Sequence, residues 1–407
     1  MRSLLGRFHR PMSRGLVNNM LTMNNLGDGS TLSLDFTTGV LDPRLTFTRA
    51  STVATYINSS GYVATATTNE PRFDYSPTNI GEPRGLLVEG SATNLLNWSE
   101  TFATTGGTNN NWADTNLTRT STNNTSPRND ATALRITASA GNGTIISSAA
   151  IGTSASRTLS VWLRRVTGTG NIQYTLDNGT NWTTQVITSS WVRYSFAATT
   201  ADQRVGFRIV TSGDAIEVWG AQLEAGSGAS SYIVTGASQV TRNRDTAVMS
   251  NISALNYTNA AGTLFVDFTN NTENANFAGS IAFNNGANYA QRFRLGVGSL
   301  LVSYFQTNGI TGLGTNLVGA RTSFARAKAA SSYSFDGTTT TTLMSMNGAA
   351  ASVTPSSSAA ASVSIPTNLS LNSDNSSGAF DYVSMTIRSI KYFPTAKSLV
   401  DMNGLTT

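Results

Sequence analysis

Apolar residues recur at every second position in short runs along this chain, and this pattern most limits the folds that the chain can adopt. In "TLSVWLRRV" the residues Leu159, Val161 and Leu163 fall on one face, and "WVRYSFAA", "GFRIV" and "AIEVWGAQLE" continue the alternation. A strand with one apolar face must bury that face against a second sheet. We therefore predict an all-β protein with two antiparallel β-sandwich (jelly-roll) domains, preceded by an extended N-terminal arm and a β-hairpin strap.

The distribution of aromatic residues divides the chain further. All six tryptophans lie between Trp98 and Trp219, whereas later strands such as "GTLFVDFTN" and "DYVSMTIRSIKYFP" use Phe and Tyr. The segment "TAKSLVDMNGL" after Pro394 predicts a short helix. We expect four parts: a basic arm at residues 1–27, an extended strap with a hairpin at 28–94, a first sandwich at 95–245 and a second sandwich at 250–407.

The strap contains the tripeptide Glu-Pro-Arg twice, at residues 70–72 and 82–84. Its prolines fix φ and push each preceding residue toward extended geometry, so this part should run as an edge segment across a surface. The polar loop 58–61 between two short apolar runs predicts a hairpin. We interpret the repeated Glu and Arg side chains as ion pairs that fix the strap between the arm and the first sandwich, and not as a reaction centre.

Charged residues are sparse and unevenly placed. They make up 12% of the chain, about half the usual share, and the net charge is +5. Four arginines precede the first acidic residue, Asp28; they are Arg2, Arg7, Arg10 and Arg14. The rest of the chain carries 23 basic and 22 acidic side chains. A nearly neutral body offers no basic stripe for phosphates, so we expect no nucleic-acid partner. The arm either docks on a partner or folds back on its own chain.

Cysteine is absent, which excludes disulfides and thiolate metal sites. No apolar run approaches the roughly 20 residues that span a bilayer, and we expect no membrane insertion. The start "MRSLLGRFHRPM" has charges where a signal peptide needs an apolar core, so standard secretion is not expected.

The order "LTFTRAST…EPRFDY…GEPRGLLVEGSATNLL…W…VWGAQLEAGSGASSYIVT…VTRNRD" resembles bacteriophage virion proteins, in which this signature precedes a carbohydrate-binding-module-like sandwich. The last segment, with its closing strand "MTIRSIKYFP" and a short helix, resembles the concanavalin A/laminin-G-like sandwiches of the same proteins. The resemblance implies these two folds for residues 95–245 and 250–407. It also implies a structural protein of the tail-fibre or head-decoration type. The resemblance does not cover the arm, but the isolated positive charge there makes its four arginines the candidate virion-anchoring residues.

Catalytic residues are not apparent. Glycoside hydrolysis needs two carboxyl groups that face each other across the bond. The best pair in the first sandwich, Glu217 and Glu224, lies seven residues apart among apolar or small neighbours, and the single histidine, His9, lies in the arm. We therefore predict that the protein is not an enzyme.

Binding residues are easier to nominate. Indole rings stack on sugar faces, and the candidate glycan-binding residues are Trp112 in a polar loop and Trp162 on the face opposite Leu163. Tryptophans in such positions are more often packing residues. In "NSDNSSG", Asp374 has calcium-loop spacing, but Met385 stands where a calcium loop places its Glu. We expect no cofactor, with Asp374 as a weak candidate for calcium.

Taken together, these features predict a virion surface protein that is assembled in the host cytoplasm and exposed on the particle. It would dock on other virion proteins through its arm, associate as a homo-oligomer, with a trimer favoured, and bind host surface glycans weakly and multivalently. The alternative is a bacterial extracellular carbohydrate-binding or glycan-hydrolysing protein.

Overall fold

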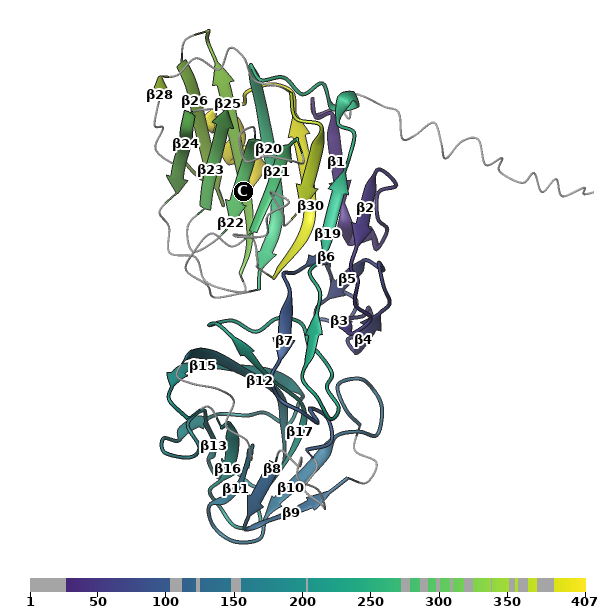
Figure 1. Ribbon diagram of the computed structural model, residues 1–407, viewed down its shortest axis with the longest axis vertical. Coiled ribbons are helices and arrows are strands. Elements are labelled where there is room, and N and C mark those ends of the chain that lie inside the picture. The colour runs from purple at the N-terminus through teal and green to yellow at the C-terminus, as the bar shows by residue number, and fades with distance from the viewer. Residues whose placement is uncertain are drawn as a thin grey trace, which may run out of the picture.

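The computed structural model describes most of the chain. The described residues are 27–102, 112–121, 125–147, 155–202, 204–271, 279–285, 292–297, 301–307, 310–317, 325–337, 339–350, 356–357, 365–371 and 384–407. Almost all regular structure in these ranges is antiparallel β-strand, in two sandwiches placed end to end (Figure 1). The prediction of an all-β fold with two antiparallel sandwiches is confirmed.

The first sandwich is built from two facing sheets. One has the order β15 (Val192–Thr200), β12 (Ala155–Thr167), β17 (Ala215–Ala225), β10 (Leu134–Ala138) and β9 (Leu117–Thr120). The other has the order β14 (Thr183–Gln185), β13 (Ile172–Thr175), β16 (Gly206–Ile209), β11 (Gly143–Ser147) and β8 (Trp112–Thr115). Leu159, Val161 and Leu163 point into the core between the sheets, as their period-two spacing predicts.

The second sandwich also has two facing sheets. One has the order β27 (Ala349–Ala350), β26 (Thr339–Met346), β25 (Arg326–Phe335), β20 (Ala261–Asn270), β30 (Met385–Phe393), β6 (Pro83–Val88) and β5 (Arg72–Tyr75), with β1 (Leu32–Asp35) on β30 and β28 (Ser356–Ser357) on β26. The other has the order β2 (Leu45–Thr48), β19 (Thr246–Met249), β29 (Asn368–Leu371), β21 (Gly279–Asn284), β22 (Arg292–Val297), β23 (Leu301–Thr307) and β24 (Ile310–Leu317).

Two short ladders and three short helices complete the described structure. The hairpin of β3 (Ala54–Ile57) and β4 (Val63–Ala66) forms where the sequence predicts it. The helix α2 (Leu399–Thr406) begins after Ser398, whose side chain forms a capping box with Asp401. The other two helices are the short 3₁₀ helices η2 (Phe36–Thr38) and η3 (Ser253–Leu255). The second ladder pairs β7 (Ala92–Asn94) with β18 (Val240–Arg242).

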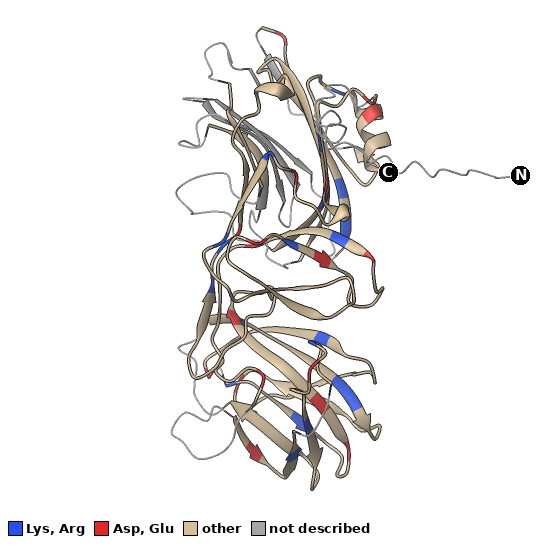
Figure 2. Ribbon diagram, turned by 90° about the vertical axis from the view of Figure 1, so that its right-hand side faces the viewer, with Lys and Arg blue, Asp and Glu red and all other residues tan. Residues whose placement is uncertain are grey.

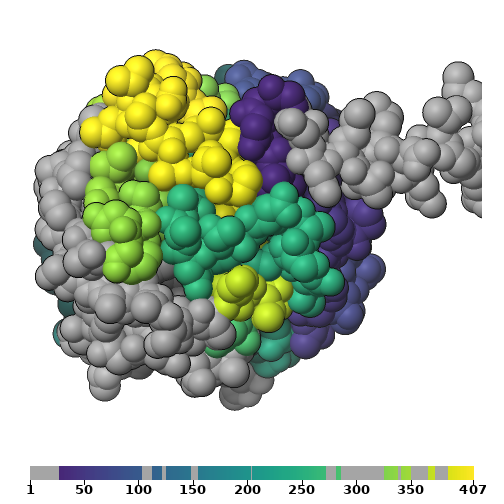
Figure 3. All heavy atoms as spheres, turned by 90° about the horizontal axis from the view of Figure 1, so that it is seen from above, coloured from purple at the N-terminus to yellow at the C-terminus, as the bar shows by residue number. Residues whose placement is uncertain are grey.

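Most of residues 28–94 join the second sandwich instead of forming a separate strap, which corrects our prediction, and the β3–β4 hairpin packs against the first sandwich. Strands β1, β5 and β6 join one sheet of the second sandwich and β2 joins the other, so that the N-terminal and C-terminal segments lie side by side (Figure 3). The reason is the apolar face of each strand: Leu32, Leu34, Phe47, Leu86 and Val88 all enter the core of the second sandwich.

The first sandwich is therefore an insertion in the second. The chain leaves through β7, builds the first sandwich and returns through β18, which pairs with β7. Strands β1, β2 and β6, before the first sandwich, share one hydrophobic core with β19, β20, β21, β25, β26, β29 and β30, after it. The two sandwiches are consequently joined by two antiparallel connecting strands rather than by one linker.

A β-bulge in β17 orients the residues that face the junction between the sandwiches. Ser160 lies opposite Gln222, and Trp162 lies opposite Trp219. Val161 of β12 is therefore opposite two residues of β17, Gly220 and Ala221. Gly220 occupies the bulge with φ +64°, and a Cβ there would lie 3.0 Å from the Trp162 ring. Only glycine fits this position without displacing that indole.

Candidate functional site

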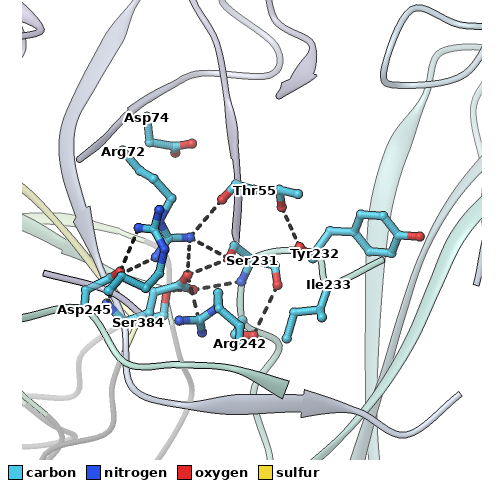
Figure 4. Close-up of polar contacts among 12 residues, drawn as sticks. Thr55, Arg72, Asp74, Ser231, Tyr232, Ile233, Arg242, Asp245 and Ser384 are labelled. Atoms are coloured by element: carbon cyan, nitrogen blue, oxygen red, sulfur yellow. Dashed lines mark hydrogen bonds and ion pairs between the residues drawn. The ribbon is translucent and has the colours of Figure 1, made fainter. Parts of the chain in front are cut away.

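Arg72, the arginine of the first Glu-Pro-Arg repeat, lies fully buried between two carboxylates. Its Nη1 is 2.7 Å from Oε2 of Glu89, and its Nη2 ion-pairs with Oδ2 of Asp245. Strand β5 supplies Arg72, the residue directly after β6 is Glu89, and Asp245 directly precedes β19. Two neighbouring strands of the second sandwich and a segment 156 residues after Glu89 therefore meet at one guanidinium (Figure 4).

Two further arginines complete this group. Nη1 of Arg49 lies 3.1 Å from Oδ1 of Asp245, and Nη2 of Arg242 lies 3.5 Å from Oε2 of Glu89. Each of these side chains is at most 1% exposed. We call Arg49, Arg72, Glu89, Arg242 and Asp245 the ion cluster.

The ion cluster also holds the first sandwich. Ser231, which follows β17, donates its N–H to Oε1 of Glu89 at 2.8 Å and its hydroxyl to Oε2, while Ser384 of the second sandwich donates its hydroxyl to Oε1 at 2.9 Å. Arg72 donates to the Ser231 hydroxyl and to the carbonyl of Thr55, both at 2.8 Å. The hairpin and both sandwiches therefore contact the same few charges.

The charges in the cluster stabilise one another. Burial alone would raise the pKa of Glu89, but Arg242, Arg72 and Ser231 outweigh it and hold that pKa well below its usual range. Burial opposes the charge of Arg72 too, yet Asp245 and Glu89 raise its pKa above the ordinary value. For Arg49, burial dominates and lowers the pKa despite the neighbouring Asp245.

The interpretation of the repeats as a structural fastening is retained, but the partners differ from those expected. Glu70 accepts from the N–H and hydroxyl of Thr67, and Glu82 accepts from the side chain of Asn79, so both acids stabilise their own turns. Arg72 pairs instead with Glu89 and Asp245. The sequence does contain a signal for these partners, because "LVEG" and "TRNRD" place Glu89 and Asp245 next to apolar strands. An acid that is buried beside such a strand needs a partner of opposite charge.

A pocket of about 300 Å³ lies beside the ion cluster, between the hairpin, the first sandwich and the second sandwich. We call it the joint pocket. Its lining combines aromatic rings, hydroxyl groups and charged side chains, among them Asp74, Arg84, Trp162, Trp191 and Arg193. The volume is at the lower end of those that hold small ligands.

Trp162 is placed at this pocket but is nearly buried. It is 7% exposed, makes edge contacts with the rings of Trp219 and Tyr232, and carries the guanidinium of Arg193 at 4.6 Å from its centroid. With Arg193 on its face, this indole forms part of the pocket wall rather than a free stacking platform.

Trp112 does not lie in a polar loop, which corrects our prediction. It begins β8, is 1% exposed and packs against Phe102 at a centroid distance of 4.8 Å in the core of the first sandwich. A sugar cannot reach a ring that is covered in this way. The residues before it are rich in Asn, Gly and Thr, and this local polarity hid its inward direction.

Asp74 is a lining residue whose pKa is shifted toward neutral pH. Its Oδ1 accepts the N–H of Ile57 in the hairpin at 2.8 Å, and its Oδ2 lies 3.9 Å from Nη1 of Arg84. Burial raises its pKa from 3.8 to about 6, and the hydrogen bond from Ile57 and the charge of Arg84 only partly offset this. Asp74 therefore exchanges a proton within the physiological range.

The carboxylates considered for catalysis are engaged separately. Glu217 is ion-paired with Arg135 at 2.7 Å and Arg164 at 2.5 Å, while Glu224 accepts from Ser230 and Gln222, and burial raises its pKa. Neither lines the joint pocket. Their contacts give each a structural role.

The remaining predicted sites lie outside the described residues; these are Arg2, Arg7, Arg10 and Arg14 of the arm, and Asp374. Within the described ranges no group of three or more His, Asp or Glu side chains could hold a metal ion. The described helices include none long and apolar enough to cross a membrane. Charged residues appear as separate bands on an otherwise uncharged ribbon (Figure 2).

No protein-family model matches the sequence, and no curated protein matches it. Among solved structures, botulinum neurotoxin type C, whose cell entry depends on two ganglioside molecules, aligns with 13% identity over 40% of this chain and 39% of its own, at a TM-score of 0.33. The CBM40 of a Ruminococcus gnavus sialidase, bound to sialyllactose, aligns with 15% identity over 36% of this chain and 82% of its own, at 0.31. The chain thus spans about two fifths of the toxin. Since both TM-scores are low, we transfer no function from either protein.

Replacing Arg72 by Ala should lower the free energy of unfolding by about 3–5 kcal/mol, because it leaves two buried carboxylates without their shared partner. Urea denaturation followed by tryptophan fluorescence measures this loss.

The matched control is Arg44→Ala. Arg44 pairs with Asp42 at 2.8 Å, but its side chain is 38% exposed, so its removal should cost no more than about 1 kcal/mol. Equal losses for the two variants would contradict a structural role for the ion cluster.

Asp74→Asn should make the protein more stable than the parent above pH 6, by up to about 3 kcal/mol. The raised pKa means that the protonated form suits the folded state. The stabilising contribution of protonated Asp74 to the free energy of unfolding is therefore complete below about pH 4 and is lost as the pH rises through about 6. An Asn side chain carries no charge at any of these pH values, and its oxygen still accepts the N–H of Ile57. Urea denaturation of both proteins from pH 4 to 8 tests this.

Asp42→Asn is the control with the opposite sign. Burial works against the ionised form of Asp42, but hydrogen bonds from Arg44 lower its pKa, so the ionised form stabilises the fold. This contribution is complete above about pH 4 and is lost only at lower pH, so Asp42→Asn should be less stable than the parent by a constant amount from about pH 4 to 8. A stability difference for Asp74→Asn that stays constant across this range would refute the assignment.

Proposed function

We propose that this chain is a bacteriophage virion structural protein, of the tail-fibre or head-decoration type, that is displayed on the particle surface and binds host glycans weakly. The observation that carries the proposal is the convergence of the signature residues. Arg49 of "LTFTRAST", Arg72 of "EPRFDY", Glu89 of "GLLVEG", and Arg242 and Asp245 of "VTRNRD" all meet in the ion cluster.

A buried ion cluster suits a protein whose work is mechanical. Desolvation of five charges is costly, but it gives specificity, because only one arrangement of the segments that carry them pairs all five. A displayed binding protein needs its two sandwiches held in one relative orientation. No reaction is required of the cluster, which agrees with a non-enzymatic role.

Glycan binding is assigned to the joint pocket. The rings of Trp162 and Trp191 provide apolar surface, and the hydroxyl of Thr78 provides a hydrogen-bonding group next to it. This mixture matches the two kinds of surface on a sugar. One such site binds weakly, and several copies on a particle, as in a trimer, would make adhesion strong.

The proposal is tested by locating the protein. A chain tagged after Thr407 should label the surface of purified phage particles in immunogold electron microscopy. A second chain that lacks residues 1–20 should fold but fail to join particles, because the arm arginines are proposed to dock on other virion proteins.

Two results would contradict this assignment. Tagged protein that is found only in the medium, apart from particles, would favour the bacterial carbohydrate-binding or hydrolytic protein. Normal incorporation of the truncated chain would remove the arm as the anchor. Circular dichroism of the truncated chain separates a docking defect from misfolding.

A further inference from the structure

The charged residues that line the joint pocket are two arginines, Arg84 and Arg193, and two acids, Asp74 and Glu89. Of the two acids, only Glu89 is ion-paired with arginines outside the pocket, and Asp74 is left as the one carboxylate facing Arg84 and Arg193. Glu89 accepts from Ser231 and Ser384 and is paired with two arginines of the ion cluster, while Asp74 accepts from the hairpin. The pocket therefore has more positive charge available to a ligand than negative charge.

Arg193 is the first of the two arginines that supply this positive charge. Its Nη1 donates to the carbonyl of Ser230 and its Nη2 to the hydroxyl of Ser160, both at 2.8 Å, and its Nε has no acceptor among the described residues. Both acceptors are neutral oxygens, so these bonds orient the guanidinium without neutralising it. The Trp162 ring supports its other side at 4.6 Å.

Arg84 is the second arginine and lies nearer to solvent. Its side chain is 41% exposed, and its contact with Asp74 is long, at 3.9 Å. A guanidinium at this distance from its carboxylate can turn toward a bound anion at little cost. Arg84 belongs to the second Glu-Pro-Arg repeat, whose arginine has no place in the ion cluster.

Guanidinium groups bind carboxylates by paired, charge-assisted hydrogen bonds. The rest of the lining offers aromatic and aliphatic surface from Trp191, Val63 and Ile57 together with hydroxyl groups, which suits a sugar ring and not a bare inorganic ion. We propose that the joint pocket selects a saccharide unit that carries a carboxylate, with Arg193 and Arg84 as its carboxylate-binding residues; this inference rests on the glycan binding proposed above.

The test compares two probes that differ only at the carboxyl group. A glucuronate-containing oligosaccharide and its carboxyl-reduced, neutral form are titrated into the full chain by calorimetry. We expect the acidic form to bind at least tenfold more tightly. Arg84→Gln and Arg193→Gln should each reduce that preference about fivefold or more, while Arg44→Gln, which changes an exposed arginine elsewhere, should leave it unchanged.

Melting temperatures of all variants are recorded beside the titrations to detect unfolding. If Arg193→Gln unfolds, the binding preference of Arg84→Gln, which changes an exposed side chain, tests the proposed site by itself. Equal binding of the two probes would overturn the selectivity while leaving glycan binding intact, and binding of neither probe would overturn both. An unchanged preference in Arg84→Gln, or displacement of the acidic probe by equimolar inorganic phosphate, would also overturn this site.

Discussion

The pairing of buried Arg72 with Glu89 and Asp245 is the interaction on which the rest of the structure depends. Removing these charges from water is costly, and the cost is offset only while all three groups are in place. Because the groups come from β5, from the end of β6 and from the segment before β19, the pairing requires that residues 28–94 fold onto the second sandwich. The same carboxylate, Glu89, then binds Ser231 and so holds the first sandwich.

The inserted topology makes this pairing necessary. Two short strands, β7 and β18, connect the sandwiches, and a ladder of this length would bend if nothing else held it. Asn94 at the end of β7 adds to the hold, since its side chain donates to the carbonyls of Ala221 and Ile233. The joint pocket exists because these contacts keep the three walls at a fixed separation.

Local features of the fold could be predicted from the sequence, whereas long-range partners could not. Alternation at Leu159, Val161 and Leu163 fixed which face is buried, and the polar loop before Tyr62 gave the hairpin. An alternating pattern predicts which face of a strand is apolar, but it does not predict which sheet the strand joins. The sequence therefore predicts a surface strap for residues 28–94, whose strands β1, β2, β5 and β6 in fact belong to the second sandwich. Trp112 was misplaced for the same reason, because its inward direction depends on the neighbouring strand β11.

The site was predicted in part. The arginine repeats and Trp162 do lie at the junction, but Glu89, Asp245 and Arg193 were missed, since each acquires its role from residues on other strands. The central claim is that the ion cluster makes the two sandwiches one unit. Differential scanning calorimetry of the full chain tests it most directly. The account predicts one cooperative transition whose calorimetric and van't Hoff enthalpies agree, and two independent, separately reversible transitions would contradict it.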